Sequence, residues 1–235
     1  MPFSTENKRK LLSGVPMFAG LAPRELEALV GVARTTHLEA RDQLFHKGDA
    51  GSQIYVVIRG TLKALTTSAE GDDVVFGIFG SGEVLGEIAL LGSPHRTATV
   101  AAISECDLLM IDRRDFMAFL RSHPDVAIEL LSVIAGRLKR VSELVEDTLF
   151  LNLPVRLAKK LMIYAGTYGE EEGATIRINL KLSQEEWGDL VGATRESINK
   201  QLRAWVEMGL VEIDHGYIVI RRLSELEKLA GVVVV

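Results

Sequence analysis

The chain has 235 residues, of which 47% are apolar and 25% are charged, and its formal net charge is −5. These values are typical of a globular protein with one large domain or two modest ones, and they argue against a fibrous or disordered chain and against a polycation that coats nucleic acid. The single cysteine, Cys106, excludes an intramolecular disulfide and a four-cysteine iron–sulfur or zinc site. Because no apolar run is long enough to span a bilayer and the first residues lack a signal-peptide pattern, we expect a cytoplasmic protein without a membrane partner.

The first half of the chain predicts two helices followed by short strands. Lys8–Leu12 favours a short helix, and Ala22-Pro23-Arg24-Glu25 starts a second one with an early proline and an acidic first turn. From Thr35 to Ile111, short apolar runs alternate with glycines, which predicts an antiparallel barrel or jelly roll.

Two details of this strand region can be tested separately. Ile54–Ile58 and Thr61–Leu65 flank Arg59-Gly60, and this spacing predicts a tight hairpin. Cys106–Ile111 is the last strand-like run, so we expect the thiol of Cys106 to be buried.

The segment Gly86-Glu87-Ile88-Ala89-Leu90, followed by Arg96-Thr97-Ala98, has the residue types that a phosphorylated sugar requires. Gly86 leaves the backbone open to a ligand, and one helical turn over Glu87–Leu90 would offer free N–H groups to an anion. Arg96 supplies a planar cation, Glu87 can accept a proton from a sugar hydroxyl, and Thr97 can donate or accept. We predict a pocket for one compact phosphate with a ribose attached. The alternative is a Glu87–Arg96 salt bridge on the sheet edge that binds nothing.

After the strands, apolar residues recur with helical spacing. Asp112–Arg121 predicts one helix, and Asp125–Leu149 predicts the longest helix of the chain. Within the long helix, a coiled-coil seam is spaced alternately by three and four positions, at Leu131, Ile134, Leu138, Val141, Val145 and Thr148. The seam could pack on its own domain or on the same helix of a second subunit. We favour a parallel homodimer, because the stripe continues well beyond the last strand. Arg137 and Arg140 flank the seam, and we expect both to be solvated.

The end of the long helix predicts a domain boundary. Asn152-Leu153-Pro154 interrupts the helical pattern, Val155–Tyr168 resumes it, and residues 169–173 read as a solvated acidic loop. We therefore divide the chain into an effector domain over residues 1–124, a dimerisation helix and hinge over 125–152, and a C-terminal domain over 153–235.

The last part of the chain predicts a winged helix-turn-helix. Ser183 and Glu186 form a capping box before a helix that ends at Gly192, and Thr194 caps a second helix, Arg195–Met208. Two short strands around Asp214-His215-Gly216 then form a hairpin wing.

The second of these helices has one polar side near its N-terminus and an apolar side opposite. Ile198, Leu202 and Trp205 would pack on the domain, so the polar side is free to enter the major groove. Arginine can read guanine through two hydrogen bonds, and glutamate can accept one from cytosine. The candidate DNA-binding residues are Thr194, Arg195, Glu196, Ser197, Asn199, Lys200 and Arg203. The alternative is a solvated helix face with a structural role.

Three features together resemble one family. G-E-x-A-L followed by R-T-A resembles the phosphate-binding cassette of cyclic-nucleotide-binding domains, and T-R-E-S-I-N-K resembles the recognition helix of cyclic-AMP receptor protein relatives. With the long helix between them, nearly the whole chain resembles the superfamily of the cyclic-AMP receptor protein and the fumarate–nitrate regulator, which are dimeric transcription factors. The fold so implied is α+β: an N-terminal β-roll, a dimerisation helix and a C-terminal winged helix-turn-helix.

This resemblance implies specific roles. Arg96 would pair with the cyclic phosphate and Glu87 would hold the ribose 2′-hydroxyl, within a site that includes Gly86, Ile88, Ala89, Thr97, Val141 and Ser142. Arg195, Glu196 and Lys200 would read a half-site like TGTGA, and each dimer would bind an inverted repeat with half-sites about one helical turn apart. RNA polymerase is a further expected partner.

The resemblance leaves the effector open between cyclic AMP and cyclic GMP. Arg137-Leu138-Lys139-Arg140-Val141-Ser142 resembles the family's R-L-x-x-T-S, whose threonine and serine meet adenine, but Val141 replaces the threonine. Thr97 resembles the residue that meets the guanine amino group in cyclic-GMP-dependent kinases. Cyclic AMP therefore keeps the family's preference, and cyclic GMP is the competitor.

Other functions have weaker support. The superfamily also contains haem sensors, but no histidine among His37, His46, His95 and His123 has a context that favours iron, so we expect no metal. A regulator of the same fold that works without a ligand stays open. A cupin-like enzyme would need histidines and a carboxylate clustered around a metal, which the scattered histidines do not suggest, so we do not expect an enzyme.

Overall fold

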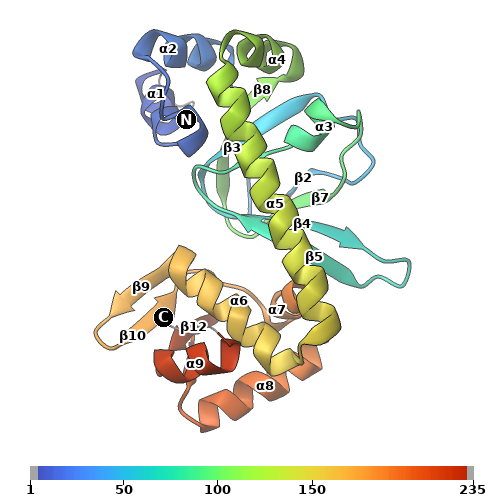
Figure 1. Cartoon of the computed structure of the whole chain (residues 1–235), viewed down its shortest axis with the longest axis vertical. Helices are drawn as coiled ribbons and strands as arrows, with labels where there is room; N and C mark the ends of the chain where they lie inside the picture. The colour runs from blue at the N-terminus through green and yellow to red at the C-terminus, as the bar shows by residue number, and fades with distance from the viewer. Residues whose placement is uncertain (1–4, 232–235) are drawn as a thin grey trace. The chain divides into compact units, whose positions relative to one another are not determined.

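The computed structural model describes residues 5–231 of the chain, and Figure 1 shows the order of its helices and strands. Packing divides the chain into two compact units: one combines the residues up to Thr66 with Phe76–Leu138, and the other combines Thr67–Val75 with the residues from Lys139 onward. The division of the chain into three functional regions stays a prediction. Among residues 5–231, none of the helices combines the length and the apolarity that a bilayer crossing requires.

Two antiparallel four-stranded sheets form the centre of the first unit, except that the end of β4 and the start of β5, within Thr67–Val75, are assigned to the second unit. One sheet has the order β1-β8-β3-β6 and the other has the order β2-β7-β4-β5. Their strands are β1 (Arg34–Leu38), β2 (Gln43–Phe45), β3 (Gln53–Arg59), β4 (Leu62–Thr67), β5 (Asp73–Phe79), β6 (Val84–Leu85), β7 (Thr99–Ala102) and β8 (Cys106–Asp112). The jelly-roll prediction for this region is confirmed.

Alternation along β3 builds two hydrophobic cores. Tyr55 and Val57 point into a core that both sheets share, whereas Ile54, Val56 and Ile58 point into a second core on the outer face. β8 alternates in the same way, and its Cys106 is fully buried in the shared core, as predicted. The second core is covered by helices: α1 (Thr5–Ser13), the 3-10 helix η1 (Pro16–Phe18), α2 (Pro23–Val32), α4 (Arg113–Ser122) and the start of α5 (Pro124–Phe150).

The predicted hairpin around Arg59-Gly60 is wrong. β3 and β4 follow each other in the chain, but they belong to different sheets, so the turn carries the chain from one sheet to the other. Gly60 has a φ of 90°, and a Cβ there would lie 2.2 Å from the Glu105 carbonyl oxygen. The glycine is therefore needed because the turn presses against the segment before β8.

The second unit contains a four-stranded sheet of order β11-β12-β10-β9 with helices packed around it. Its elements are α6 (Leu153–Tyr168), β9 (Gly169–Glu172), β10 (Thr175–Ile178), α7 (Gln184–Val191), α8 (Arg195–Glu207), β11 (Val211–Asp214), β12 (Tyr217–Ile220) and α9 (Leu223–Ala230). The side chain of Asn152 caps α6 by accepting from the Val155 N–H at 3.2 Å, and Trp187 of α7 is buried. The two helices and the hairpin wing that the sequence predicts are confirmed.

Two elements of this unit differ from the sequence prediction. The acidic segment 169–173 is exposed as expected, but its first four residues form the edge strand β9, paired with β10 through contacts such as Gly169 with Ile178. The sequence pattern also did not predict α9, which packs against α6 through the buried side chain of Leu226.

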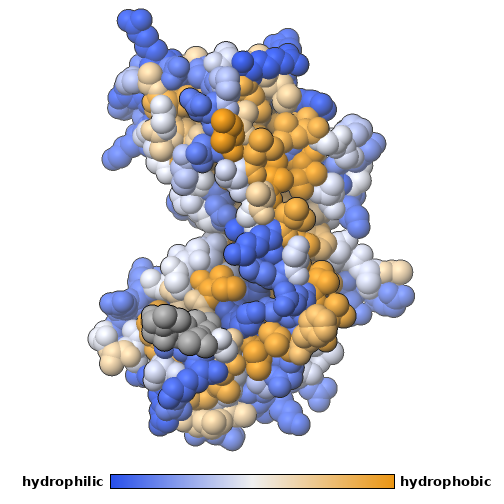
Figure 2. Space-filling model, viewed as in Figure 1, coloured by the Kyte–Doolittle hydropathy of each residue, from blue (hydrophilic) through white to orange (hydrophobic). Residues whose placement is uncertain are grey.

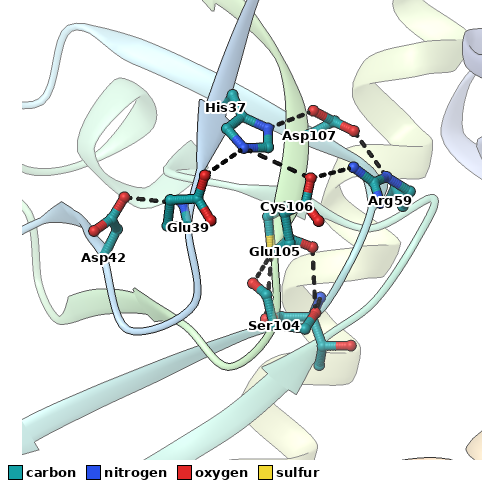
Figure 3. Close-up of polar contacts among 9 residues, drawn as sticks. His37, Glu39, Asp42, Arg59, Ser104, Glu105, Cys106 and Asp107 are labelled. Atoms are coloured by element: carbon teal, nitrogen blue, oxygen red, sulfur yellow. Dashed lines mark hydrogen bonds and ion pairs between the residues drawn. The ribbon is translucent and has the colours of Figure 1, made fainter.

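An exposed ion cluster joins three strands of the first unit (Figure 3). His37 of β1 lies 2.8 Å from Asp107 of β8, 3.4 Å from Glu39 and 3.7 Å from Glu105. Arg59 of β3 donates to both Asp107 and Glu105 at 2.8 Å. The hydrogen bond to Asp107 is the main reason why the pKa of His37 is raised above its ordinary value.

This cluster predicts a pH-dependent part of the stability. Because the folded state raises the pKa of His37, its contribution is fully present below about pH 6.5, the pKa in the unfolded chain, and is lost as the pH rises through the folded-state value. His37→Gln should remove this component, so the urea midpoints of variant and wild type should converge above the folded-state pKa. His46→Gln, which removes an exposed histidine outside the cluster, is the control and should keep the contribution of His37. Parallel profiles for His37→Gln and wild type would contradict the assignment.

Candidate functional site

The turn before α3 (Glu87–Leu91) brings the backbone close to a buried arginine. Gly86, at the N-cap of α3, has a φ of 87°. A Cβ on Gly86 would lie 2.4 Å from Nη1 of Arg96, and a Cβ on Gly51 would lie 2.2 Å from the Cβ of Ala89. Both glycines are therefore required by close packing, and sequence reasoning identified only Gly86.

Arg96 is almost fully buried, with 4% of its surface exposed. Its guanidinium donates to the Gly86 carbonyl at 3.2 Å and to the Gln53 carbonyl at 2.9 Å, and its Nε has no acceptor among the residues that the structure describes. Burial lowers the pKa of Arg96, while Tyr55 and Glu87 oppose this shift. A buried cation with a free donor favours an anionic partner, because such a partner would offset the cost of desolvation.

Glu87 is buried to the same degree, with 2% exposed, but its partner is Arg137 rather than Arg96. Arg137 of α5 also donates to the Val84 carbonyl and lies over the ring of Phe79, 4.9 Å from its centre. The expectation that Arg137 is solvated is therefore wrong, because the side chain reaches back from the long helix into the cassette. The alternative of a Glu87–Arg96 salt bridge is replaced by this Glu87–Arg137 pair.

The other predicted effector residues occupy different environments. Ala89 is buried in α3, whereas Ile88 and Thr97 are exposed. Val141 and Ser142 lie on the exposed side of α5 in the second unit, so their role in effector binding stays a prediction. Over residues 5–231, no group of three or more histidine, cysteine or carboxylate side chains is arranged to hold a metal ion.

Helix α8 separates its polar and apolar residues as predicted. Thr194 caps the helix by accepting from the Ser197 N–H at 3.2 Å, and Ile198, Leu202 and Trp205 are buried. Its exposed side carries four charged candidates, Arg195, Glu196, Lys200 and Arg203.

Not every polar candidate on α8 projects to solvent. The side chain of Asn199 donates to Gln184 of α7 at 2.7 Å, which joins the two helices of the motif. The hydroxyls of Ser197 and Thr194 lie 2.9 Å apart, within the cap. These three residues therefore support the geometry of the motif; the sequence predicted the cap role of Thr194 but not the contacts of Ser197 and Asn199.

The apolar stripe of α5 is largely uncovered in the single chain, and Figure 2 shows hydrophobic residues following this helix. Of the predicted seam residues, Leu131, Leu138, Val141 and Val145 are exposed, whereas Ile134 packs against the helix-covered core of its own unit. An exposed apolar face of this kind marks an interaction surface.

The Glu87–Arg137 pair predicts a measurable coupling. Glu87→Gln and Arg137→Gln should each lower the free energy of unfolding, because each leaves a poorly solvated charge without its partner. The double variant should lose less than the sum, with a coupling energy of about 0.5–3 kcal/mol in a urea-unfolding cycle. The control cycle pairs Glu87→Gln with Arg140→Gln, because Arg140 is exposed, and should be additive. Additivity in both cycles would mean that the pair does not act as a unit.

Two parts of the chain match known domain families, and the whole chain has similar relatives. Residues 35–123 match the cyclic nucleotide-binding domain family, and residues 155–229 match the Crp-like helix-turn-helix domain. Over 221 residues the chain is 28% identical to the CRP-like cAMP-activated global transcriptional regulator of Mycobacterium tuberculosis, covering 94% of this chain and 97% of that protein.

A second relative and a solved structure extend the likeness. The cyclic AMP receptor protein of Thermus thermophilus is 29% identical over 219 residues, covering 93% of this chain and 98% of that protein. The structure of the c-di-GMP responsive global regulator CLP of Xanthomonas campestris has a TM-score of 0.74 at 22% identity, covering 86% of this chain and 100% of that one. With both domain families matched in the expected order, the chain belongs to the cyclic-AMP receptor protein and fumarate–nitrate regulator family, which consists of transcription regulators and not of enzymes.

Proposed function

We propose that this regulator binds a cyclic mononucleotide in the cassette and, as a homodimer, binds an inverted-repeat DNA site like TGTGA in response. The observation that carries the proposal is the buried guanidinium of Arg96, which is held by two backbone carbonyls and keeps an Nε without an acceptor among the described residues. A cyclic phosphate would supply the missing anion, and hydrogen bonds between charged groups are the strong ones.

The ribose has a partner beside the phosphate site. Glu87 immediately follows Gly86, whose carbonyl binds Arg96, so its carboxylate is close enough to Arg96 to act on it electrostatically. Arg137 binds Oε1 of Glu87 and so orients the carboxylate, which can accept a hydrogen bond from a sugar hydroxyl. The pocket residues that we propose are Gly86, Glu87, Ile88, Ala89, Arg96 and Thr97, with Val141 and Ser142 on the long helix.

Cyclic AMP is the favoured effector, because two relatives that span nearly the whole chain are described as cAMP-activated or as a cyclic AMP receptor. Cyclic GMP is the second candidate, since Thr97 is exposed directly after Arg96 and can offer a hydroxyl to a guanine amino group.

The DNA-binding step is assigned to α8. Its four charged candidates, Arg195, Glu196, Lys200 and Arg203, are exposed on a side away from the buried Ile198, Leu202 and Trp205, so this side can enter a major groove. We assign base reading to Arg195, Glu196 and Lys200, and we assign Arg203 to phosphate or base contacts. Thr194, Ser197 and Asn199 support the end of the helix that approaches the DNA.

The link between effector and DNA would run through α5. Arg137 ties the cassette to α5, and its neighbour Leu138 is an exposed seam residue. A ligand that hydrogen-bonds to Glu87 would therefore also affect α5. The apolar stripe of this helix would pair with that of a second subunit. Converting a mostly inactive dimer into a mostly active one requires about 5.5 kcal/mol of differential binding.

The pocket assignment predicts the effect of Arg96→Leu. Loss of the buried guanidinium should weaken binding of cyclic AMP or cyclic GMP by about 10–100-fold in calorimetry. The fold should survive, because an apolar side chain can replace a buried charge with little loss of stability. Arg24→Leu, which removes an exposed arginine of the same unit, is the control and should bind like the wild type. Full affinity in Arg96→Leu would remove the phosphate site from the cassette.

Purified protein also tests which cyclic nucleotide is the effector and whether any ligand is needed. DNA binding should be measured by fluorescence anisotropy with no nucleotide, with cyclic AMP and with cyclic GMP, on a duplex that carries a TGTGA inverted repeat. Stimulation by one nucleotide identifies the effector. Equal DNA binding in all three conditions would favour a regulator that works without a ligand.

The recognition helix predicts a base-specific loss. Arg195→Ala should cost about 1–3 kcal/mol on the best site and should relax preference at one base pair of each half-site. Lys228→Ala, which removes an exposed cation on α9, is the control and should leave this preference unchanged. An equal loss on every duplex would show that Arg195 contacts phosphate instead of a base.

A further inference from the structure

The Arg96 guanidinium lies over two aromatic rings. The centre of the Phe45 ring is 4.1 Å from the guanidinium carbon, and the centre of the Tyr55 ring is 5.6 Å from it. Both distances are within the range of about 6 Å over which the negative face of an aromatic ring attracts a cation. The two rings also contact each other, with centres 5.9 Å apart and planes inclined by 33°.

Each ring reaches this position from a different sheet. Tyr55 is one of the β3 residues that point into the core shared by the two sheets, and it is buried. Phe45 ends β2 of the opposite sheet and packs, partly buried, against the same core. The packing of the two sheets around their shared core therefore places both rings beside the guanidinium.

The type of support determines what the arginine can bind. A carboxylate beside Arg96 would neutralise it, occupy its N–H groups and repel an anionic ligand. The aromatic rings attract the cation without neutralising it, and although the Tyr55 hydroxyl also accepts from the guanidinium, the Nε–H is left without an acceptor among the described residues. Two observations agree with a guanidinium that is not neutralised by a carboxylate. The carboxylate of Glu87 is paired with Arg137, and the Nε of Arg96 has no acceptor among the described residues.

We propose that Phe45 and Tyr55 are positioning residues that hold the buried Arg96 by attraction between its charge and their rings, and so keep its Nε–H available to an anionic phosphate. This inference rests on the proposed function of the cassette and adds two residues to it that no motif in the sequence marks. Phe45 is the nearer ring and has the larger effect.

The test measures affinity for the cyclic nucleotide that binds wild-type protein, by calorimetry on the full chain. Phe45→Leu and Phe45→Met each remove the ring but keep an apolar side chain, and each should weaken binding by about threefold to thirtyfold. Phe45→Trp keeps an aromatic face and should retain affinity within about twofold. Tyr55→Phe, which keeps the ring, should bind more tightly than Tyr55→Leu.

Two controls separate positioning from general loss of structure. In an Arg96→Leu background, Phe45→Leu should cause no further loss of affinity, because the ring acts only through the arginine. Phe119→Leu shrinks a ring in the helix-covered core, away from Arg96, and should lower the thermal midpoint without changing affinity.

The outcomes distinguish this inference from the function on which it rests. Wild-type protein that binds neither cyclic nucleotide would overturn the proposed function. Wild-type binding that requires Arg96 but is unchanged in both Phe45→Leu and Phe45→Met would overturn only the positioning role. An equal loss of affinity in Phe45→Leu and Phe45→Trp would also overturn the positioning role. The loss would then come from any change in side-chain shape and not from removal of the aromatic ring.

Discussion

The effector domain depends on one buried positive charge that is not neutralised by a carboxylate. Arg96 is held by the carbonyls of Gly86 and Gln53 and by the faces of two aromatic rings, so its charge is supported but not cancelled. A group of this kind costs free energy in the empty protein and regains it when an anion arrives. In the function proposed above, the phosphate of the cyclic nucleotide would be this anion.

The surrounding fold explains how this charge can be kept in place. Alternation along β3 and β8 gives each strand two buried faces, one toward the second sheet and one toward the covering helices. Gly51 and Gly86 leave room for Ala89 and Arg96, because a Cβ at either glycine would overlap one of these side chains. The Glu87–Arg137 pair connects this packed region to α5, so one side chain joins the effector domain to the helix that carries the apolar seam.

Much of this arrangement could be predicted from local patterns. Helical spacing predicted α5 and α8, and the cap residues Ser183 and Thr194 predicted where α7 and α8 begin. The effector pocket at Gly86, Glu87 and Arg96 stays a prediction. Features that depend on distant contacts could not be predicted in this way. The change of sheet at Gly60, the partner of Glu87 and the rings beside Arg96 all join residues far apart in sequence, and Arg137 looked solvated because its helix alone offers it no acceptor.

The edge strand β9 limits how this protein can associate with others. It presents Glu170, Glu171 and Glu172 in succession at the open border of the C-terminal sheet, and all three are exposed. Like charges on such a border oppose the addition of a strand from another molecule, which protects the sheet against fibre-like stacking. The same negative border repels the phosphate backbone of nucleic acid, which disfavours the approach of a duplex to this edge of the sheet.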